Sequence, residues 1–440
     1  MFAKILIANR GEIAVRIIRA CKEMGIMSVA IYSMADADAL HVALADESVC
    51  IGPAAASESY LDENRVMSAA LATGVTAIHP GYGFLSENAH FASLCQKHGI
   101  AFIGPSAETM MALSDKAVIK ARMEAAGLPV IKGSPVLEDV AMALDEAARI
   151  GYPVMLKARS GGGGRGIRKV ENAAQLQQLF PLAVAESKAS FNDEALYLEK
   201  CVYPARHVEM QILADEKGNV LCLGERDCSI QRRHQKLIEE TPSPAVHHDQ
   251  RQGLTQKVRQ AVAKIGYVGA GTLEFLMDAQ GQFWFMEMNL RLQVEHGITE
   301  MMTGVDIVKW QIRVAAGIPL SIPQEAIVLD GVCVECRINA LTTGTVQLVH
   351  IPGGPFVRFD TALVQGLTIS PFYDSLVGKL MVYAASREEA MRKLKAALCE
   401  LVIEGIETNV EEQLAIVGES AFINGNYDLR FMEGRASWHC

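Results

Sequence analysis

The sequence feature that most constrains the fold is a ten-residue alternation from Met286 to Glu295. Its even positions carry only Met, Leu and Val, whereas its odd positions carry Glu287, Asn289, Arg291, Gln293 and Glu295. A period of two predicts a β-strand with one buried face and one polar face. At about 3.3 Å per residue, an unbroken strand would separate the first and last carboxylates by about 26 Å. Because that span is too long for one reacting centre, we predict that the chain turns near Arg291.

The polar face of this segment divides into two groups with different chemistry. Before the turn, Glu287 and Asn289 offer hard oxygen ligands, and Glu274 on the preceding arm of a predicted hairpin adds a third, a set that suits Mg²⁺. After the turn, Arg291 suits an anion clamp and Glu295 suits a base. A solvated face of an edge hairpin is the alternative, and it is favoured for an isolated Glu-x-Asn. The complete alternation favours a functional site.

The first part of the chain has the pattern of an open α/β domain. Short apolar strands are predicted at Lys4–Ala8, Ser28–Tyr32, Ala77–His79 and Ala101–Gly104, with an amphipathic helix over Ile13–Met24. This βαβ order predicts a Rossmann-like parallel sheet over residues 1–113. The first turn lacks Gly-x-Gly-x-x-Gly, which disfavours a nicotinamide site.

A run of four glycines at 161–164 marks the second domain, predicted over residues 114–320. It follows a predicted strand, Tyr152–Lys157, and its backbone N–H groups suit a phosphate, so we predict a mobile lid over about 129–203. A flexible surface linker is the alternative for this loop alone. Beyond it the pattern becomes strand-rich. Residues 331–440 read as a mixed α/β domain with a final helix near Arg387–Val402, making the whole an α/β and α+β multidomain protein.

Composition excludes several classes of protein. The net charge of −10 argues against a nucleic-acid binder, and no apolar run approaches the length needed to cross a bilayer. The ten cysteines are scattered, which is typical of buried free thiols in a reducing compartment, so we expect a soluble, cytoplasmic chain. A polyanionic ligand must then meet local basic residues. The block 225–240 supplies Arg226, Arg232, Arg233, His234 and Lys236, with a surface ion-pair network as the alternative.

Together these segments resemble the biotin carboxylase family of ATP-grasp enzymes, and the resemblance runs along the whole chain. Its motifs occur in family order. They are Ile7–Ile13, His79–Asn88, Phe102–Pro105, Arg206–Glu209, residues 225–240, Met288–Asn289 with Arg291, Gln293–His296, Glu335–Ala340, Tyr373–Ser375 and Gly405–Asn409. The resemblance implies an ATP-grasp domain with a mobile lid between an N-terminal Rossmann-like domain and a C-terminal mixed domain.

The resemblance also implies a role for each candidate residue. ATP would contact Lys116, Lys157, Gly162, Gly163, Gly164, Glu199, His207, Gln231, His234 and Leu276. Two Mg²⁺ ions, with Mn²⁺ as a substitute, would be held by Glu274, Glu287 and Asn289. Bicarbonate would be bound by Lys236, Arg291, Gln293 and the backbone of Val294, and Glu295 would remove its proton. Arg337 would stabilise the biotin enolate.

The implied reaction needs partners. The chain has no Met-Lys-Met biotin-attachment motif, so biotin would arrive on a separate carrier protein and leave to separate carboxyltransferase subunits, as in acetyl-CoA carboxylase. Family members are commonly homodimers. Two alternatives stay open. One is an ATP-grasp carboxylase or ligase with a different acceptor, and the other is a non-catalytic nucleotide-binding subunit.

Three segments depart from the family pattern. Arg159–Ser160 replaces the usual Ser-Gly before the glycine loop, and His296–Gly297 replaces the usual His-Pro, which predicts a looser chain beside Glu295. After Ala340, a short neutral stretch, residues 341–345, replaces an acidic segment and joins directly to a predicted Val-Gln-Leu strand. Because this stretch borders Arg337, we expect any change to affect the biotin side.

Overall fold

The N-terminal segment folds into the parallel sheet that its short apolar runs predict. The computed structural model describes residues 1–159 and 166–434. The strands are β1 (Lys4–Ile7), β2 (Met27–Ser33), β3 (Glu47–Gly52), β4 (Ala77–His79) and β5 (Ala101–Phe102), in the order β3-β2-β1-β4-β5, all parallel. The helices are α1 (Gly11–Glu23), α2 (Leu40–Leu44), α3 (Glu63–Thr73), α4 (Ala89–Lys97) and α5 (Ala107–Leu113). In β1, Ile5, Leu6 and Ile7 are fully buried, as a parallel strand covered on both faces requires.

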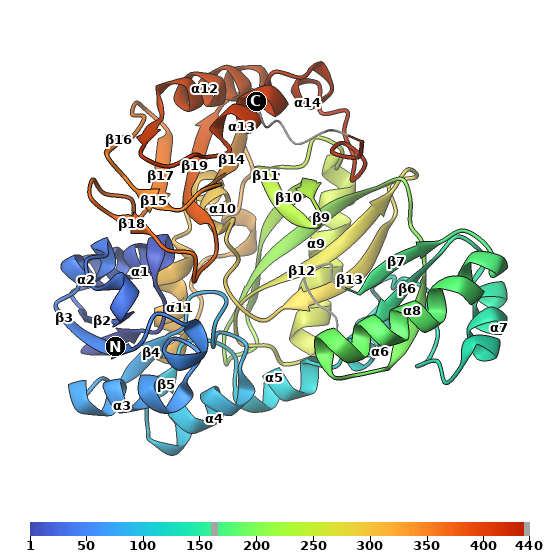
Figure 1. Cartoon of the computed structure of the whole chain (residues 1–440), viewed down its shortest axis with the longest axis horizontal. Coiled ribbons are helices and arrows are strands. Elements are labelled where there is room, and N and C mark those ends of the chain that lie inside the picture. The colour runs from blue at the N-terminus through green and yellow to red at the C-terminus, as the bar shows by residue number, and fades with distance from the viewer. Residues whose placement is uncertain (160–165, 435–440) are drawn as a thin grey trace.

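A small unit with its own core follows, at the right of Figure 1. After α6 (Lys116–Ala125) it comprises α7 (Val140–Ile150), β6 (Val154–Ala158), β7 (Ile167–Val170), α8 (Ala173–Phe191) and β8 (Leu196–Lys200). The strands form an antiparallel sheet in the order β7-β6-β8. Leu156, Leu176 and Leu198 are buried between this sheet and its two helices. It occupies most of the region predicted as a lid, and Gly162, Gly163 and Gly164 lie outside the described residues.

The centre of the molecule is an eight-stranded antiparallel sheet in the order β13-β12-β9-β10-β11-β14-β19-β17. Its strands are β9 (Ala205–Ala214), β10 (Val220–Arg232), β11 (Gln235–Thr241), β12 (Gly269–Asp278), β13 (Phe283–Asn289), β14 (Val332–Asn339), β17 (Val357–Thr361) and β19 (Leu376–Ala384). The associated helices are α9 (His248–Lys264), α10 (His296–Thr303) and α11 (Ile307–Ala315). Strands β11 and β14 pair directly, so one sheet joins sequence that we assigned to two domains.

The rest of the C-terminal region packs beyond β19, at the top of Figure 1. It contains β15 (Gly344–Thr345), β16 (Leu348–His350), β18 (Thr368–Ile369), β20 (Val402–Glu404), α12 (Arg387–Glu400), α13 (Val410–Val417) and α14 (Ser420–Ile423). Two predictions were wrong here. The helix over 387–402 is not the last, because α13 and α14 follow it. The strand predicted at 346–348 begins later than expected, because Val346 is fully buried between β15 and β16, and only Leu348 belongs to β16.

Two predictions from composition can be compared with these coordinates. Of the nine described cysteines, Cys50 and Cys399 are exposed, whereas the other seven are buried free thiols. Among the described helices, none is both long and apolar enough to pass through a lipid bilayer. The predicted fold class, with its parallel N-terminal sheet, central strand-rich region and C-terminal mixed α/β region, is confirmed.

Candidate active site

The chain turns where the distance argument predicts. Strand β13 ends at Asn289, residues 290–291 bend, and α10 begins at His296. Leu292 fills the turn and is fully buried. Glu287 and Asn289 therefore lie on β13, whereas Glu295 lies beyond the turn, immediately before α10.

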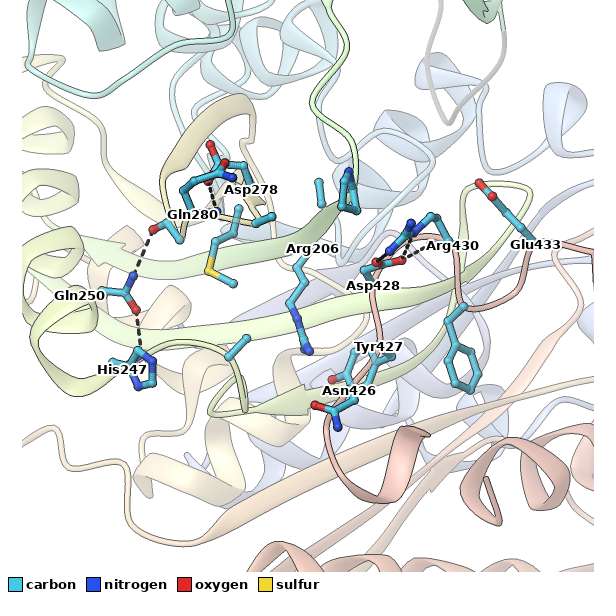
Figure 2. A pocket seen from close by; sticks show the side chains of 17 residues that line it. Arg206, His247, Gln250, Asp278, Gln280, Asn426, Tyr427, Asp428, Arg430 and Glu433 are labelled. Atoms are coloured by element: carbon cyan, nitrogen blue, oxygen red, sulfur yellow. Dashed lines mark hydrogen bonds and ion pairs between the residues drawn. The ribbon is translucent and has the colours of Figure 1, made fainter. Parts of the chain in front are cut away.

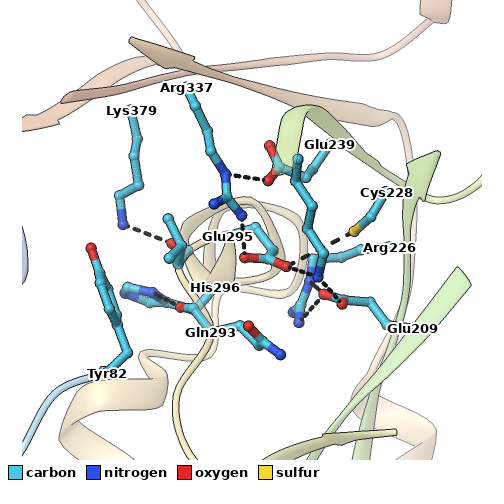
Figure 3. Close-up of polar contacts among 12 residues, drawn as sticks. Tyr82, Glu209, Arg226, Cys228, Glu239, Gln293, Glu295, His296, Arg337 and Lys379 are labelled. Atoms are coloured by element: carbon cyan, nitrogen blue, oxygen red, sulfur yellow. Dashed lines mark hydrogen bonds and ion pairs between the residues drawn. The ribbon is translucent and has the colours of Figure 1, made fainter. Parts of the chain in front are cut away.

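Glu295 lies at the centre of a buried charge cluster, with Arg337 and Glu239 around it in Figure 3. Its side chain is fully buried; one oxygen accepts from Lys236 Nζ at 2.6 Å and the other from Arg337 Nη2 at 2.9 Å. Burial by itself raises the pKa of Glu295, but the two cations outweigh it and hold that pKa well below the ordinary value. The resting carboxylate is therefore ionised.

The ammonium group of Lys236 bonds to three carboxylates. Its ammonium donates to Glu209 at 2.7 Å and to Glu274 at 3.3 Å, in addition to Glu295. The fully buried guanidinium of Arg226 holds the other side of Glu209, donating at 2.6 Å. Sequence reasoning did not assign a role to Glu209, and it placed Arg226 in the basic block expected to meet a polyanion or to form ion pairs, of which the structure shows the ion pair. The signal for Glu209 was present, because it lies two residues after His207 on a strand and therefore on the same face.

Arg337 bridges the cluster to a second pair of acidic residues. Its Nε donates to Glu239 at 2.6 Å. Glu335 lies directly opposite Glu239 in the β11–β14 register, and neither of its oxygens has a hydrogen-bond partner among the described residues. Burial raises the pKa of Glu239 to about 7, with a smaller contribution from Glu295 and against the lowering effect of Arg337. Burial and the carboxylate of Glu239 raise the pKa of Glu335 well above its ordinary value. These two acids therefore hold protons more tightly than Glu295.

The predicted bicarbonate ligands come together around the turn. The guanidinium of Arg291 donates to Glu87 at 3.0 Å and to Gln293 at 3.2 Å, and Gln293 reaches Glu274 at 3.5 Å. The carbonyl of Val294 accepts from the fully buried Lys379 at 2.8 Å, as Figure 3 shows. Lys379 was not among the sequence candidates. No local pattern marks it, since it reaches the turn only by pairing of β19 with β14.

The proposed metal ligands lie on neighbouring strands. Glu274 and Glu287 face each other in the β12–β13 register, and Asn289 donates to Glu274 at 2.9 Å. Two carboxylates and an amide oxygen form a donor set that fits Mg²⁺. Among the described residues, ligand atoms lie within 4.8 Å of one another in His207, Glu209 and Glu274 and in Glu209, Cys228 and Glu295. Lys236 bonds to carboxylates of both groups, so we interpret them as ion-pair networks.

The described nucleotide candidates come from the small unit, from α6 and from the central sheet with its β10–β11 turn. Lys116 pairs with Glu287 at 3.3 Å, and both Lys120 and Lys157 pair with the buried Glu199. Gln231 lies 2.6 Å from Nδ1 of His207. His234 occupies the β10–β11 turn in the left-handed region, with φ +66°, and burial together with Lys157 lowers its pKa. Leu276 pairs with His207 across β12 and β9.

Each of the three departures from the family pattern has contacts in the structure. Gly297 is buried in the first turn of α10, and a Cβ there would lie 2.4 Å from Sδ of Met381, so the thioether fills the space of a side chain. Arg159 pairs with Asp193 at 3.1 Å on the surface. In the short stretch 341–345, Thr342 accepts from the backbone of Glu407 at 3.0 Å, which ties it to the segment after β20.

A separate cavity of about 820 Å³ lies between the β12–β13 turn and residues 426–433 (Figure 2). None of the predicted site residues lines it. Its charged groups are already paired, since Arg206 bonds to Asp227 at 3.0 Å and Arg430 bonds to Asp428 at 2.5 Å. The described candidate site residues lie instead in the Glu295 cluster and around Glu199.

Comparison with known proteins agrees with this geometry. Family models match residues 1–110 (biotin carboxylase, N-terminal domain), 115–323 (carbamoyl-phosphate synthase L chain, ATP binding domain) and 334–434 (biotin carboxylase C-terminal domain). The biotin carboxylase of Pseudomonas aeruginosa is 49% identical over 98% of each chain. The chain belongs to the biotin carboxylase family. The resemblance inferred from its motifs is therefore confirmed.

Solved structures show the same relationship in three dimensions. The biotin carboxylase domain of Hydrogenobacter thermophilus 2-oxoglutarate carboxylase, a dimer in complex with MgADP, ADP and bicarbonate, has a TM-score of 0.95 and 47% identity, covering 98% of this chain and 97% of that one. A biotin carboxylase from Campylobacter jejuni has a TM-score of 0.95 and 46% identity, covering 98% of each chain. This family member is an ATP-grasp enzyme.

Proposed function

We propose that this family member uses ATP and bicarbonate to carboxylate biotin on a separate carrier protein, as the first half-reaction of acetyl-CoA carboxylase. The observation that carries the proposal is the buried carboxylate of Glu295 between Lys236 and Arg337, one turn of chain from the acidic pair Glu274 and Glu287. A base, two cations and a metal-type donor set then converge within one site. A binding module needs no such base.

In the first step, Lys236, Arg291, Gln293 and the backbone N–H of Val294 bind bicarbonate, and Glu295 takes its proton. When Lys236 turns from Glu295 to the new anion, the pKa of Glu295 rises, because its largest stabilising partner has moved. The carboxylate then becomes able to hold the proton. The bicarbonate oxygen attacks the γ-phosphorus of ATP, the bond to ADP breaks, and carboxyphosphate forms.

In the second step, carboxyphosphate releases CO₂ and phosphate, and the phosphate takes the proton from biotin N1′. The guanidinium of Arg337 stabilises the enolate that forms, and N1′ bonds to CO₂. Its fixed bonds to Glu239 and Glu295 pre-orient Arg337 for this role. The low exposure of the cluster keeps water from the labile acyl phosphate.

We propose that Glu274, Glu287 and Asn289 hold two Mg²⁺ ions, with Mn²⁺ as a substitute. The ions, when bound, would supply positive charge to the phosphate oxygens. The nucleotide itself would contact Lys116, Lys157, Glu199, His207, Gln231, His234 and Leu276, together with Gly162, Gly163 and Gly164. The MgADP and bicarbonate named for the Hydrogenobacter relative support these assignments.

The proposed partners are a biotin carrier protein and carboxyltransferase subunits, in the cytoplasm, with a second copy of this chain in a homodimer. The dimer named for the Hydrogenobacter relative supports the last of these. Solved relatives include the biotin carboxylase domain of 2-oxoglutarate carboxylase and the biotin carboxylase subunit of pyruvate carboxylase. The acyl acceptor therefore needs its own test, and capture of endogenous carboxyltransferase subunits by the tagged chain would identify it.

The test of the activity is ADP release with ATP and Mg²⁺, measured with and without bicarbonate and free biotin. We expect release to require bicarbonate and to rise when biotin is added. Turnover with another acceptor but not with biotin would support a different ATP-grasp ligase. Bicarbonate-dependent ATP cleavage that survives Glu295→Ala would contradict the assigned base, whereas ATP binding without any bicarbonate-dependent cleavage would favour the non-catalytic alternative.

A further inference from the structure

The nucleotide side of the site contains a lysine that lies outside every family motif given above. Lys120, on α6, has a side chain only 16% exposed, and its ammonium pairs with Oε1 of Glu199. The other oxygen of the same carboxylate pairs with Lys157. Glu199 itself is 2% exposed. One buried carboxylate is thus shared by two lysines that come from different elements, α6 and β6.

This sharing leaves positive charge at a place where water is scarce. Burial lowers the pKa of Lys120 to about 7, and repulsion from the ammonium groups of Lys157 and Lys116 adds to that effect. Burial and Lys116 also lower the pKa of Lys157 to about 8. Two cations on one carboxylate are costly in the resting protein unless an anion binds to them. The arrangement is what a site for a polyphosphate requires.

We propose that Lys120 is a positioning residue of the nucleotide site, which shares the carboxylate of Glu199 so that this carboxylate does not hold the Lys157 ammonium away from the phosphates. The inference rests on the proposed binding of ATP at this site. Without Lys120, the full charge of Glu199 faces Lys157 and draws its ammonium away from the ligand. The opposing interpretation is that Lys120 only anchors α6 against the neighbouring strands.

The experiment compares Lys120→Met, which keeps the length of the side chain, with Lys120→Arg, which keeps the charge. Arg122→Met on the exposed face of the same helix is the matched control. Binding of ATP and of adenosine is measured by titration calorimetry without bicarbonate or biotin. We expect the Kd for ATP to rise about fivefold to tenfold in Lys120→Met and to change less than about twofold in the other two variants. The Kd for adenosine should change less than about twofold in all of them.

Salt and pH distinguish an electrostatic role from an anchoring role. We expect ATP binding to weaken less steeply with added salt in Lys120→Met than in wild type. The charges that face Lys120 are Glu199, Lys157, Lys116 and Glu287. Because its pKa is about 7, wild-type ATP affinity should fall between pH 6 and pH 8 more than that of Lys120→Arg, which stays charged. This comparison needs only wild type and Lys120→Arg, so it stands even if Lys120→Met folds poorly.

Two results would overturn the inference. One is an unchanged Kd for ATP in Lys120→Met, and the other is an equal loss of ATP and adenosine affinity, which is the signature of a displaced helix. A wild-type chain that binds no ATP at all is a different result, because it contradicts the proposed function on which the inference rests. If wild type binds ATP and Lys120→Met binds it with the same Kd, the inference is contradicted but the proposed function is not.

Discussion

The two halves of the site are built in different ways. The half around Glu295 lies within a single continuous sheet and the helix packed against it, and Glu209, Arg226 and Glu239 complete its ion pairs at full burial. The half around Glu199 is formed where α6 and the small three-stranded unit approach each other, and its Lys116 and Glu287 are each 38% exposed. The first half is set by strand register, and the second by how separate units pack. Substitutions in the half around Glu295 should therefore change the rate of reaction and the free energy of unfolding. Substitutions in the half around Glu199 should change the affinity for ATP and Mg²⁺.

The largest expected effect is that of Glu295→Gln. This change keeps the shape of the side chain but removes the base, so bicarbonate-dependent ATP cleavage should fall by about 10²–10⁴-fold. ATP affinity should stay within about twofold, because the nucleotide half is untouched. Steady-state ADP release and calorimetric ATP titration measure the two quantities. Glu216→Gln, in the exposed β9–β10 turn, is the control. Equal losses of rate and ATP affinity would show that the halves are not separate.

The next effect is that of Glu287→Gln, which removes one proposed metal ligand from the half around Glu199. We expect about a tenfold to hundredfold higher Mg²⁺ concentration for half-maximal activity, with the KM for bicarbonate nearly unchanged. A Mg²⁺ titration of ADP release at fixed ATP checks this. A raised KM for bicarbonate with an unchanged Mg²⁺ requirement would show that Glu287 acts on bicarbonate binding and not on the metal.

Gly297→Ala, in the half around Glu295, should lower the free energy of unfolding by about 1–2 kcal/mol, because the new methyl group meets Sδ of Met381. In a Met381→Val background the same change should be neutral or stabilising, because alanine is the better helix former and the sulfur is gone. Urea unfolding of the four proteins in this double-mutant cycle measures the coupling. Equal costs in both backgrounds would show that Met381 does not determine the residue tolerated at position 297.

The smallest effect concerns the pH dependence of stability through Glu239. Its pKa in the folded protein is raised to about 7 from an ordinary 4.5, so ionisation costs folding free energy as the pH rises through that window. The free energy of unfolding of wild type should therefore fall between pH 4.5 and pH 7 relative to that of Glu239→Gln, and the difference should level off above pH 7. Urea unfolding across this range tests it. A constant difference would show that Glu239 is ionised throughout.

Part of this site could be predicted from local sequence. The alternation at 286–295 and the distance argument predicted the strand and the turn near Arg291, whereas the split between metal-type and base-type residues stays a prediction. The apolar runs gave the parallel sheet, because the period of side chains along a strand is a local property. The glycine at 297 was recognised as a departure, but Met381, which fills its space, lies 84 positions further along the chain.

The sequence by itself determined the family, the fold class and the parallel N-terminal sheet, and it supplied the candidate site residues. Only the tertiary structure decided that one sheet runs through the boundary near residue 331, that Glu239 lies opposite Glu335, and that Lys379 supports Val294. Lys120 likewise reads as an ordinary helix lysine until α6 packs beside Glu199. The reason is physical. Period and composition act over a few residues, whereas strand register and buried ion pairs join side chains far apart in the chain, and their energies exist only once those side chains meet.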